Sequence, residues 1–599
     1  MTRTSIARFS VLLCTLTLAS GQSGIAGTWK VKGQADANRI TSNIRAAQFL
    51  THATFGPSHE DIVALSARMQ EIGTKPACEE WIDRQFDLPA TKHMPLVDDM
   101  LLQDNIDPLV FKDRGKRFRQ HAFWHIALTA DDQLRQRMAW ALMQMFVVGD
   151  GGQSFNNHLL DTSGRQRWTG MVNYYDMLVE NSFDRYRKTL EDVTYSPIMG
   201  LYLSHLQNRK PEEAEGRFPD ENYAREIMQL FSIGLFELKN DGTFRLDENN
   251  ELIETYDNET IRNFARIFTG FVYARGNGFN RSKNLHEGML LFQEEHDDGE
   301  KVLLGGRVVE AGQSVELDIH QALNNVADHS NVGPFVARHL IQRFVHSNPS
   351  RTYIRRVARK FNNNGQSMRG DFKSVLKAVL LDDEAFKGVE ITYDSEAGTV
   401  TSRANGTERS RLREPVLRYA AFLRAFRPTS NHHTGRFLIP DMFDTWGQAN
   451  YKSPSVFNFF SPEYQPPGPV RDLGASTRQP REDLVAPEFQ IATSRTINLT
   501  ANRYRADIRD ASADFGLGTA ADGRNFNCQI ALDFSRAEKA ANIRVMLRRL
   551  DVLLCHGTLS DESQEIIRAA IKANTDDKTE QARAAVLAVV TSPECVIAE

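Results

Sequence analysis

The pattern of apolar and polar positions along the chain predicts a long series of helices. Apolar residues recur at intervals of three and four over most of its length, which is the spacing that gives a helix one buried face. The clearest case is 117–146, where a break near Thr129 divides the pattern into two helices. The same spacing predicts further helices over 42–49, 60–69, 174–180, 183–192, 197–207, 220–231, 258–269, 333–345, 351–361, 372–381 and 411–426.

Two segments interrupt the helical pattern and predict small β elements. Within 236–254, Asp241-Gly242 lies between two short alternating runs, which is a hairpin signature. A second β element is expected over 289–315, where Gly305-Gly306 supplies a turn. We therefore expect a mainly α fold, with one large helical domain over 42–599 and β insertions near 236–254 and 289–315.

The segment 428–483 is rich in Pro, Gly and Asn but also carries several aromatic residues. Such a composition favours a loop that packs against the helical body over a free linker. The aromatic residues are Trp446, Phe457, Phe459 and Phe460.

The start of the chain has the features of an export signal. Arg3 and Arg8 precede the apolar run 9–19, and small residues follow before Gln22. We expect a signal peptide over 1–21, a polar leader over 22–41, and a mature protein that is soluble in the periplasm or outside the cell. No later stretch approaches the roughly 18 apolar residues of a membrane span.

Composition narrows the classes of partner. The chain of 599 residues has 41% hydrophobic and 25% charged residues and a formal net charge of -5. Nucleic-acid affinity depends largely on clustered positive charge. A negative net charge therefore argues against nucleic acid as a partner.

The C-terminal part of the chain predicts a three-helix unit near 537–595. Helices over about 537–554, 560–573 and 578–590 would run up, down and up with short loops. The ends of the first and third helices are then neighbours, which places Cys555 and Cys595 together, whereas Cys528 precedes the first helix. We expect a Cys555–Cys595 disulfide, which an oxidising compartment would permit.

One predicted helix carries a polar stripe beside its apolar face. Asn222, Arg225, Glu226 and Gln229 recur at i, i+3, i+4 and i+7. A carboxylate beside a guanidinium can position a polar substrate or orient a metal ligand. The same stripe can equally tie helices together, with Glu221 and Arg225 forming an i, i+4 ion pair. Asn222, Arg225 and Glu226 remain catalytic candidates.

A second candidate cluster is His296, Asp297 and Asp298, which precede Gly299. Adjacent imidazole and carboxylate groups can bind a divalent cation, and His296 with Asp297 can supply a general base. A turn in which Asp298 bonds its own backbone explains part of the pattern equally well. A divalent metal ion is thus a candidate cofactor.

The other histidines and the common catalytic motifs give weaker evidence for a functional site. His121 and His125 have the i, i+4 spacing of a metal pair but lack the Glu of a zinc-protease helix, which favours a place in the core. His432-His433 is expected in a loop. The chain contains no nucleophile elbow, phosphate-binding loop or dinucleotide-binding unit.

Several motifs in fixed order resemble one bacterial family. They are MGLYLSHLQNRK, FPDENYAREIMQLFSIGLFEL, NDGTFRLDENNELIETYD, ETIRNFARIFTGF, EEHDDGEKVLLG, VGPFVARHLIQRFV and a closing TSPE. Together they resemble the "domain of unknown function 1800" family from about Ala46 to the C-terminus. The resemblance implies an exported, mainly helical protein, often encoded beside a sulfatase-like family, "domain of unknown function 1501", which is then a candidate partner. It transfers no catalytic residues.

Two functions follow as hypotheses. The first is an accessory or binding protein that acts outside the cytoplasm. The alternative is a hydrolase that uses Glu226, His296 and Asp297, with or without a divalent metal ion. Convergence of Glu226 and His296 in one pocket would favour the hydrolase.

Overall fold

The computed structural model describes residues 27–103, 116–151, 155, 157–275, 279, 283–404, 410–468, 484–515 and 528–598. Helices dominate it, and every strand pairing is antiparallel. This confirms the mainly α fold expected from the sequence. The predicted signal peptide lies outside the described residues.

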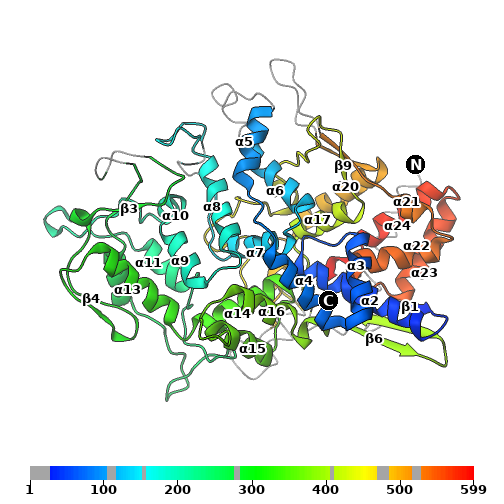
Figure 1. The fold of residues 1–599 in the computed structure, drawn as a ribbon, viewed down its shortest axis with the longest axis horizontal. Helices are drawn as coiled ribbons and strands as arrows, with labels where there is room; N and C mark the ends of the chain where they lie inside the picture. The colour runs from blue at the N-terminus through cyan, green and yellow to red at the C-terminus, as the bar shows by residue number, and fades with distance from the viewer. Residues whose placement is uncertain are drawn as a thin grey trace.

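The molecule is elongated, and the N-terminal helices lie toward one of its ends (Figure 1). They are α2 (Gln34–Ala53), α3 (His59–Ile72) and α4 (Thr74–Asp87). The Ser58 hydroxyl oxygen caps α3 by accepting a hydrogen bond from the Asp61 N–H, and the Asp61 carboxylate accepts one from the Ser58 N–H, so a complete capping box fixes where α3 starts.

The centre of the molecule is built from long, almost fully buried helices. Two of them, α6 (Arg117–Thr129) and α7 (Gln133–Met143), confirm the predicted division near Thr129. Around them lie α5 (His93–Gln103), α8 (Thr169–Asn181), α14 (Val332–Phe344), α15 (Arg351–Asn362), α16 (Phe372–Leu380) and α17 (Pro415–Ala425). Trp140 on α7 is fully buried in this core.

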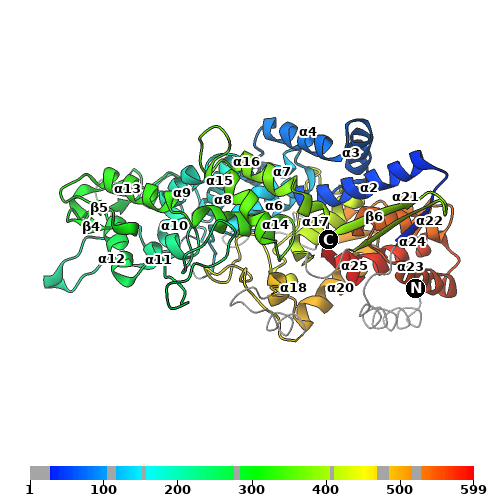
Figure 2. The ribbon, with the colours of Figure 1, turned by 90° about the horizontal axis from the view of Figure 1, so that it is seen from below.

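The opposite end of the molecule contains the predicted polar-stripe helix, which is α11. The helices at this end are α9 (Tyr186–Thr194), α10 (Pro197–Tyr202), α11 (Asn222–Gln229), α12 (Asn258–Ile267) and α13 (Val315–Asp328). In Figures 1 and 2 these helices lie at the end away from α2 and α22.

Both predicted β insertions are present, in reduced form. Over 236–254 the chain forms the isolated antiparallel bridges Phe236–Glu254, Leu238–Phe244 and Leu246–Leu252. Over 289–315, β3 (Leu290–Leu291) pairs with β2 (Phe271–Val272), and β4 (Lys301–Val302) pairs with β5 (Val308–Val309).

A three-stranded sheet near the N-terminus was not expected. β1 (Gly27–Lys30), β7 (Thr399–Ala404) and β6 (Val389–Asp394) form it in the order β1-β7-β6, with Trp29 opposite Val400. Within the segment expected as a polar leader, 22–41, the structure has β1 and the start of α2. Trp29, only 5% exposed, packs with Ala37 and Ile44 and so anchors this segment.

The C-terminal elements also differ from the prediction in one respect. The helix expected over 537–554 is instead α21 (Ser535–Glu538), α22 (Ile543–Leu550) and a π-helical turn, Asp551–Cys555. The chain breaks because Asn542 caps α22, its side chain accepting from the Val545 N–H. Then follow α23 (Asp561–Asn574), α24 (Lys578–Val590) and α25 (Pro593–Val596).

Smaller elements complete the C-terminal half. The helix predicted over 411–426 shortens to α17, because β8 (Arg411–Leu412) pairs with β12 (Ile597–Ala598). A further sheet has the order β10-β11-β9. Its strands are β10 (Ser512–Phe515), β11 (Cys528–Ala531) and β9 (Thr429–Ser430), and the helices α18 (Phe443–Trp446) and α20 (Ser494–Arg509) lie nearby in sequence.

The aromatic loop expected over 428–483 packs against the body in its described part. Trp446 and Phe460 are each 1% exposed, whereas Phe457 is open to solvent. No helix among the described residues is long and apolar enough to cross a membrane.

The first and the last described elements lie side by side. α2 contacts both β7 and the π-helical turn Asp551–Cys555, and Figure 1 shows β1, α2 and α3 beside α21 and α22. Figure 2, viewed at right angles, shows α2 close to α21 and α22 as well. This junction between elements far apart in the sequence contains the cavity described next.

A basic groove as the candidate functional site

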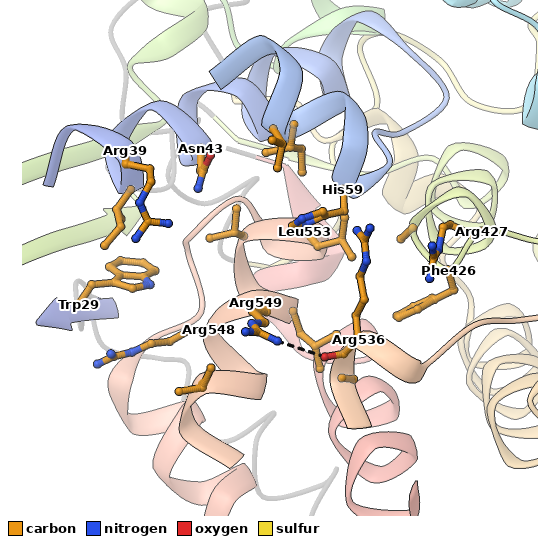
Figure 3. Close-up of a pocket in the computed structure, with 18 of the residues that line it drawn as sticks. Trp29, Arg39, Asn43, His59, Phe426, Arg427, Arg536, Arg548, Arg549 and Leu553 are labelled. Atoms are coloured by element: carbon orange, nitrogen blue, oxygen red, sulfur yellow. Dashed lines mark hydrogen bonds between the residues drawn. The ribbon is translucent and has the colours of Figure 1, made fainter. Parts of the chain in front are cut away.

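A cavity of about 680 Å³ opens between the N-terminal and C-terminal elements (Figure 3). Its lining includes six lysine and arginine side chains and only two carboxylates, Asp36 and Asp533. We call this cavity the basic groove. Its cationic residues are Lys30, Arg39, Arg427, Arg536, Arg548 and Arg549.

Several short elements place these cations around one space. Arg39 and Asn43 lie one turn apart on α2, so both face the groove, as Figure 3 shows. Arg548 and Arg549 come from α22, whose last turn they occupy. Arg427 follows α17 in a left-handed conformation with φ of 45°.

Three of the six cations have carboxylate partners. Arg39 pairs with Asp36 at 2.5 Å, Arg536 pairs with Glu60 at 2.5 Å, and Arg427 pairs with Asp533. These pairs are at the rim, and each arginine remains more than 40% exposed. Exposed pairs of this kind contribute little to stability.

The other three cations, Lys30, Arg548 and Arg549, have no carboxylate partner among the described residues. Arg549 donates only to the backbone oxygen of Arg536, at 3.3 Å, which is the dashed line in Figure 3. The groove therefore holds an excess of positive charge that the described chain does not neutralise.

Arg548 is the most enclosed of these cations. One guanidinium nitrogen donates to the Thr28 backbone oxygen at 2.7 Å, while its Nε is buried without a hydrogen-bond partner among the described residues. Burial lowers the pKa of Arg548 and the positive charge of Arg544 lowers it further, whereas the carboxylates of Asp561 and Asp551 act in the opposite direction. Arg548 is half-buried, and the exposed part of its guanidinium can donate to an anion in the groove.

His59, the first residue of α3, extends the basic lining. Burial lowers its pKa, and the positive charges of Arg536, Arg549 and Arg427 add to the effect while Glu60 opposes it. The imidazole is therefore neutral near pH 7, and a bound anion would favour its protonation.

The remaining lining is apolar or uncharged. Ile62 and Leu553 contribute aliphatic surface, and Asn43 supplies an amide. The two aromatic residues, Trp29 and Phe426, are only 5% and 4% exposed. The arrangement can bind anionic groups through arginine forks, with polar contacts between them.

The predicted polar stripe on α11 does not form one cluster. Asn222 is exposed, and its N–H donates to Asp220 at 2.9 Å. Arg225 is half-exposed and pairs with Glu221 at 3.2 Å, as the structural interpretation of the stripe requires.

Glu226 differs from its neighbours. It is half-buried, its Oε2 has no hydrogen-bond partner among the described residues, and burial raises its pKa. Burial also raises the pKa values of Tyr202 and Tyr256 to about 12 each, and the nearby Glu226 charge contributes. One oxygen of the half-buried Glu226 carboxyl group is therefore left without a hydrogen-bond partner among the described residues.

His296 and Asp297 lie in a buried ion-pair network. The His296 Nε2 is 3.0 Å from Asp318, and its Nδ1 is 3.1 Å from the Thr269 backbone oxygen. Asp297 accepts two hydrogen bonds from Arg266, at 2.7 and 2.9 Å. Both side chains are thus occupied, and no hydrogen bond or ion pair joins either of them to Glu226.

Lys301 completes this network. Its Nζ donates to Asp318 at 2.8 Å and lies 3.8 Å from Asp297. Asp298 is exposed, and its backbone oxygen accepts from the distant Gly312 N–H at 2.7 Å. The carboxylate that accepts from the turn backbone is that of Asp297, whose Oδ1 accepts from the Gly299 N–H at 2.9 Å.

The structure does not support the predicted metal site. Within the described ranges, no group of three or more His, Cys, Asp or Glu side chains is arranged to hold a metal ion. His296 and Asp297 are adjacent in sequence but bind Asp318 and Arg266 in different directions, and Asp298 points to solvent. Cations compensate these buried carboxylates, where a metal site would need them free.

His121 is a core residue, as the spacing without a Glu favoured, whereas His125 is half-buried. Burial lowers the pKa of His121 to about 3, and its ring packs against Phe118. His125 accepts from the Phe437 N–H through Nδ1 at 3.4 Å. His432 interacts with Thr434 in a loop.

Cys555 and Cys595 are free thiols in the structure, and they lie against each other. The contact with Cys555 lowers the pKa of Cys595, and the charge of Arg413 lowers it further. Cys595 donates to the Leu554 backbone oxygen at 3.3 Å. The neighbourhood expected from the helical unit is present, and the disulfide itself stays a prediction.

Sequence reasoning missed the basic groove. Its cations come from positions as distant as Lys30 and Arg549, and no local pattern brings these together. The one local signal is on α22, where Arg544 and Arg548 lie at i, i+4 and Arg549 follows. That spacing predicts a basic helix face but not the elements that lie opposite it.

Comparison with known proteins gives one finding. A family model described as "Protein of unknown function (DUF1800)" matches residues 48–597. No curated protein and no solved structure matches the chain.

Proposed function

The chain belongs to the DUF1800 family, whose function is unknown, and we propose that it is an accessory binding protein that holds an anionic ligand in the basic groove. The observation that carries this proposal is the group of three cations, Lys30, Arg548 and Arg549, that face one cavity without a carboxylate partner among the described residues. Because the chain as a whole has a net charge of -5, this local excess of positive charge does not simply reflect the overall composition.

Electrostatics explains why a ligand would bind there. Cations gathered around a low-dielectric cavity raise the local concentration of anions and their rate of association. Arginine binds carboxylate, sulfate and phosphate groups through paired N–H donors.

The test is titration of the purified protein with dextran sulfate by calorimetry at low salt. We expect saturable binding that weakens as salt is added. The variant Lys30→Gln/Arg549→Gln removes two exposed groove cations and should bind at least tenfold more weakly. The control Arg359→Gln/Lys360→Gln makes the same charge change on α15, outside the groove, and should bind like the native protein. Equal loss in both variants, or no binding at all, would overturn the proposal.

We also propose that the protein acts outside the cytoplasm, as the charged start and apolar run of residues 1–21 suggest. N-terminal sequencing of exported material should begin after Gly21. The sulfatase-like partner implied by the family resemblance is a further prediction, to be tested by co-purification with this chain.

The hydrolase remains the second candidate because of one observation. Glu226 combines half-burial, an oxygen without a hydrogen-bond partner among the described residues and a raised pKa, which suits a proton-donating carboxyl group. His296 and Asp297 no longer support that role, since both are engaged in the network with Asp318 and Arg266.

A further inference from the structure

A second cavity adjoins the basic groove and shares part of its lining. This cavity, of about 300 Å³, shares Lys30 and Arg548 with the groove. It adds Arg544 from α22 and Arg568 from α23. Lys30 and Arg548 therefore stand at the boundary between two adjoining spaces, each with its own cations.

The cations are spread over a length that one small anion does not span. Arg544 and Arg548 are separated by four residues on α22, or about 6 Å along the helix axis. Arg536 and Arg427 lie in the other cavity, on α21 and after α17. The positive charge thus follows an extended path and has no single centre.

The carboxylates that line the second cavity already have hydrogen-bond or ion-pair partners within the chain. In the second cavity, Glu565 pairs with Arg544 at 3.0 Å and also with Arg568. Asp561 accepts from the Thr28 N–H at 3.1 Å. Uncharged polar side chains also line the two cavities, namely Asn43 in the groove and Thr399 and Gln564 in the second cavity. These groups can hydrogen-bond hydroxyls between anionic groups.

We propose that the ligand is a linear acidic polysaccharide, which lies along both cavities and places successive carboxylate or sulfate groups on the groove cations and on Arg544 and Arg568. This inference rests on the proposed function and adds the class and the length of the ligand.

Two observations favour a polysaccharide over other polyanions. Proteins that hold single-stranded nucleic acid stack its bases on exposed aromatic faces, but the aromatic rings here, Trp29 and Phe426, are 5% and 4% exposed. A peptide that extended the sheet would need the open edge of β1. That edge is occupied, because Thr28 donates to Asp561 and accepts from Arg548.

The experiment measures how affinity depends on ligand length. Galacturonate oligomers of two, four and eight units are titrated into the full chain, with neutral dextran, poly-glutamate and a thymidine oligonucleotide as comparisons. We expect at least a tenfold gain in affinity from two units to eight. Neutral dextran should not bind, and poly-glutamate and the oligonucleotide should bind more weakly than the eight-unit sugar.

A variant separates the second cavity from the first. Arg544→Gln/Arg568→Gln should remove most of the gain with length while leaving the affinity for the two-unit sugar within about threefold. Both arginines are at least 32% exposed, so the fold should tolerate the change, which circular dichroism would verify. The control is again Arg359→Gln/Lys360→Gln.

The outcomes distinguish the two proposals. If dextran sulfate and every acidic oligomer fail to bind, the proposed function is wrong. If acidic oligomers bind but affinity does not change with length, or if poly-glutamate or the oligonucleotide binds more tightly, the basic groove stands as an anion site and the polysaccharide inference falls.

Discussion

The carboxyl group of Glu226 is half-buried, and one of its oxygens has no hydrogen-bond partner among the described residues. Burial raises its pKa above the ordinary value of 4.5, only partly offset by Arg225. A raised carboxyl pKa means that the folded state binds the proton more tightly than the unfolded state does. Ionisation of Glu226 therefore weakens the fold as pH rises above its ordinary pKa.

The change Glu226→Gln tests whether this residue serves stability. We expect the free energy of unfolding at pH 7 to stay the same or to rise, because the amide removes a penalised charge and keeps the shape. Urea unfolding of both proteins at pH 7 and pH 4 measures it, and the variant's advantage should shrink at the lower pH. A clear loss of stability at pH 7 would show instead that the carboxylate anchors the helices.

His205 shows how a buried histidine makes the fold sensitive to acid. Its ring is fully buried, stacks on Tyr223 at 3.9 Å, and lies 2.9 Å from the Thr194 backbone oxygen through Nε2. Burial lowers its pKa to about 4. In the unfolded chain the pKa is about 6.5, so between these values the unfolded state binds the additional proton.

Stability should consequently fall as pH decreases from about 6.5 to about 4. The linkage relation gives about 1.4 kcal/mol per pH unit for one such histidine. In His205→Phe this contribution should vanish. The loss of unfolding free energy between pH 7 and pH 5 should therefore be about 2 kcal/mol smaller in the variant than in the native protein. The exposed His320, changed to Gln, is the control. Identical pH profiles for native protein and His205→Phe would refute the assignment.

At the scale of elements, the amphipathic helices could be predicted and the small sheets could not. α12, α14 and α15 lie within about two residues of their sequence-based bounds, because each buries a continuous apolar stripe. β1 has four residues, and its partner β7 lies about 370 positions later. No local period encodes such a pairing.

The C-terminal helices provide the structural basis for the disulfide prediction. The π-helical turn ends at Cys555, and α25 carries Cys595 to it, with the Arg413 guanidinium donating to the Leu554 backbone oxygen at 3.0 Å and to that of Cys595 at 3.3 Å. Arg413 thus holds the two segments in register, so bond formation requires only small movements of the thiols.

We expect protein from an oxidising compartment to contain the Cys555–Cys595 bond. Non-reducing peptide mapping should recover the two cysteine peptides as one species. By the loop-closure argument the bond should add roughly 2–4 kcal/mol, so Cys555→Ser should unfold at a lower temperature than the oxidised native protein and at a similar temperature to the reduced one. Two separate thiol peptides from exported protein would contradict the prediction.

At the scale of the whole molecule, the candidate site depends on the contact between the first and the last described elements. Periodicity identified α2 and α3 in part, and the basic face of α22 is visible in the sequence, but their approach across the groove depends on tertiary packing. The sequence motifs singled out His296 and Asp297 as candidate site residues. In the structure both side chains form buried ion pairs instead. Adjacent titratable residues are a weak guide to function when burial can pair them.

A ligand in the basic groove would connect these elements, and this has a measurable consequence. Binding to the folded state alone stabilises it by about 2.7 kcal/mol at a ligand concentration of 100 Kd. We therefore expect dextran sulfate to raise the unfolding temperature of the native protein and to slow amide exchange in β1, α2 and α22 together, since the ligand would contact all three. The variant Lys30→Gln/Arg549→Gln should show neither effect at the same ligand concentration, whereas Arg359→Gln/Lys360→Gln should show both. Protection confined to elements outside the junction, such as α15, would mean that the polyanion binds elsewhere and that the groove is not the site.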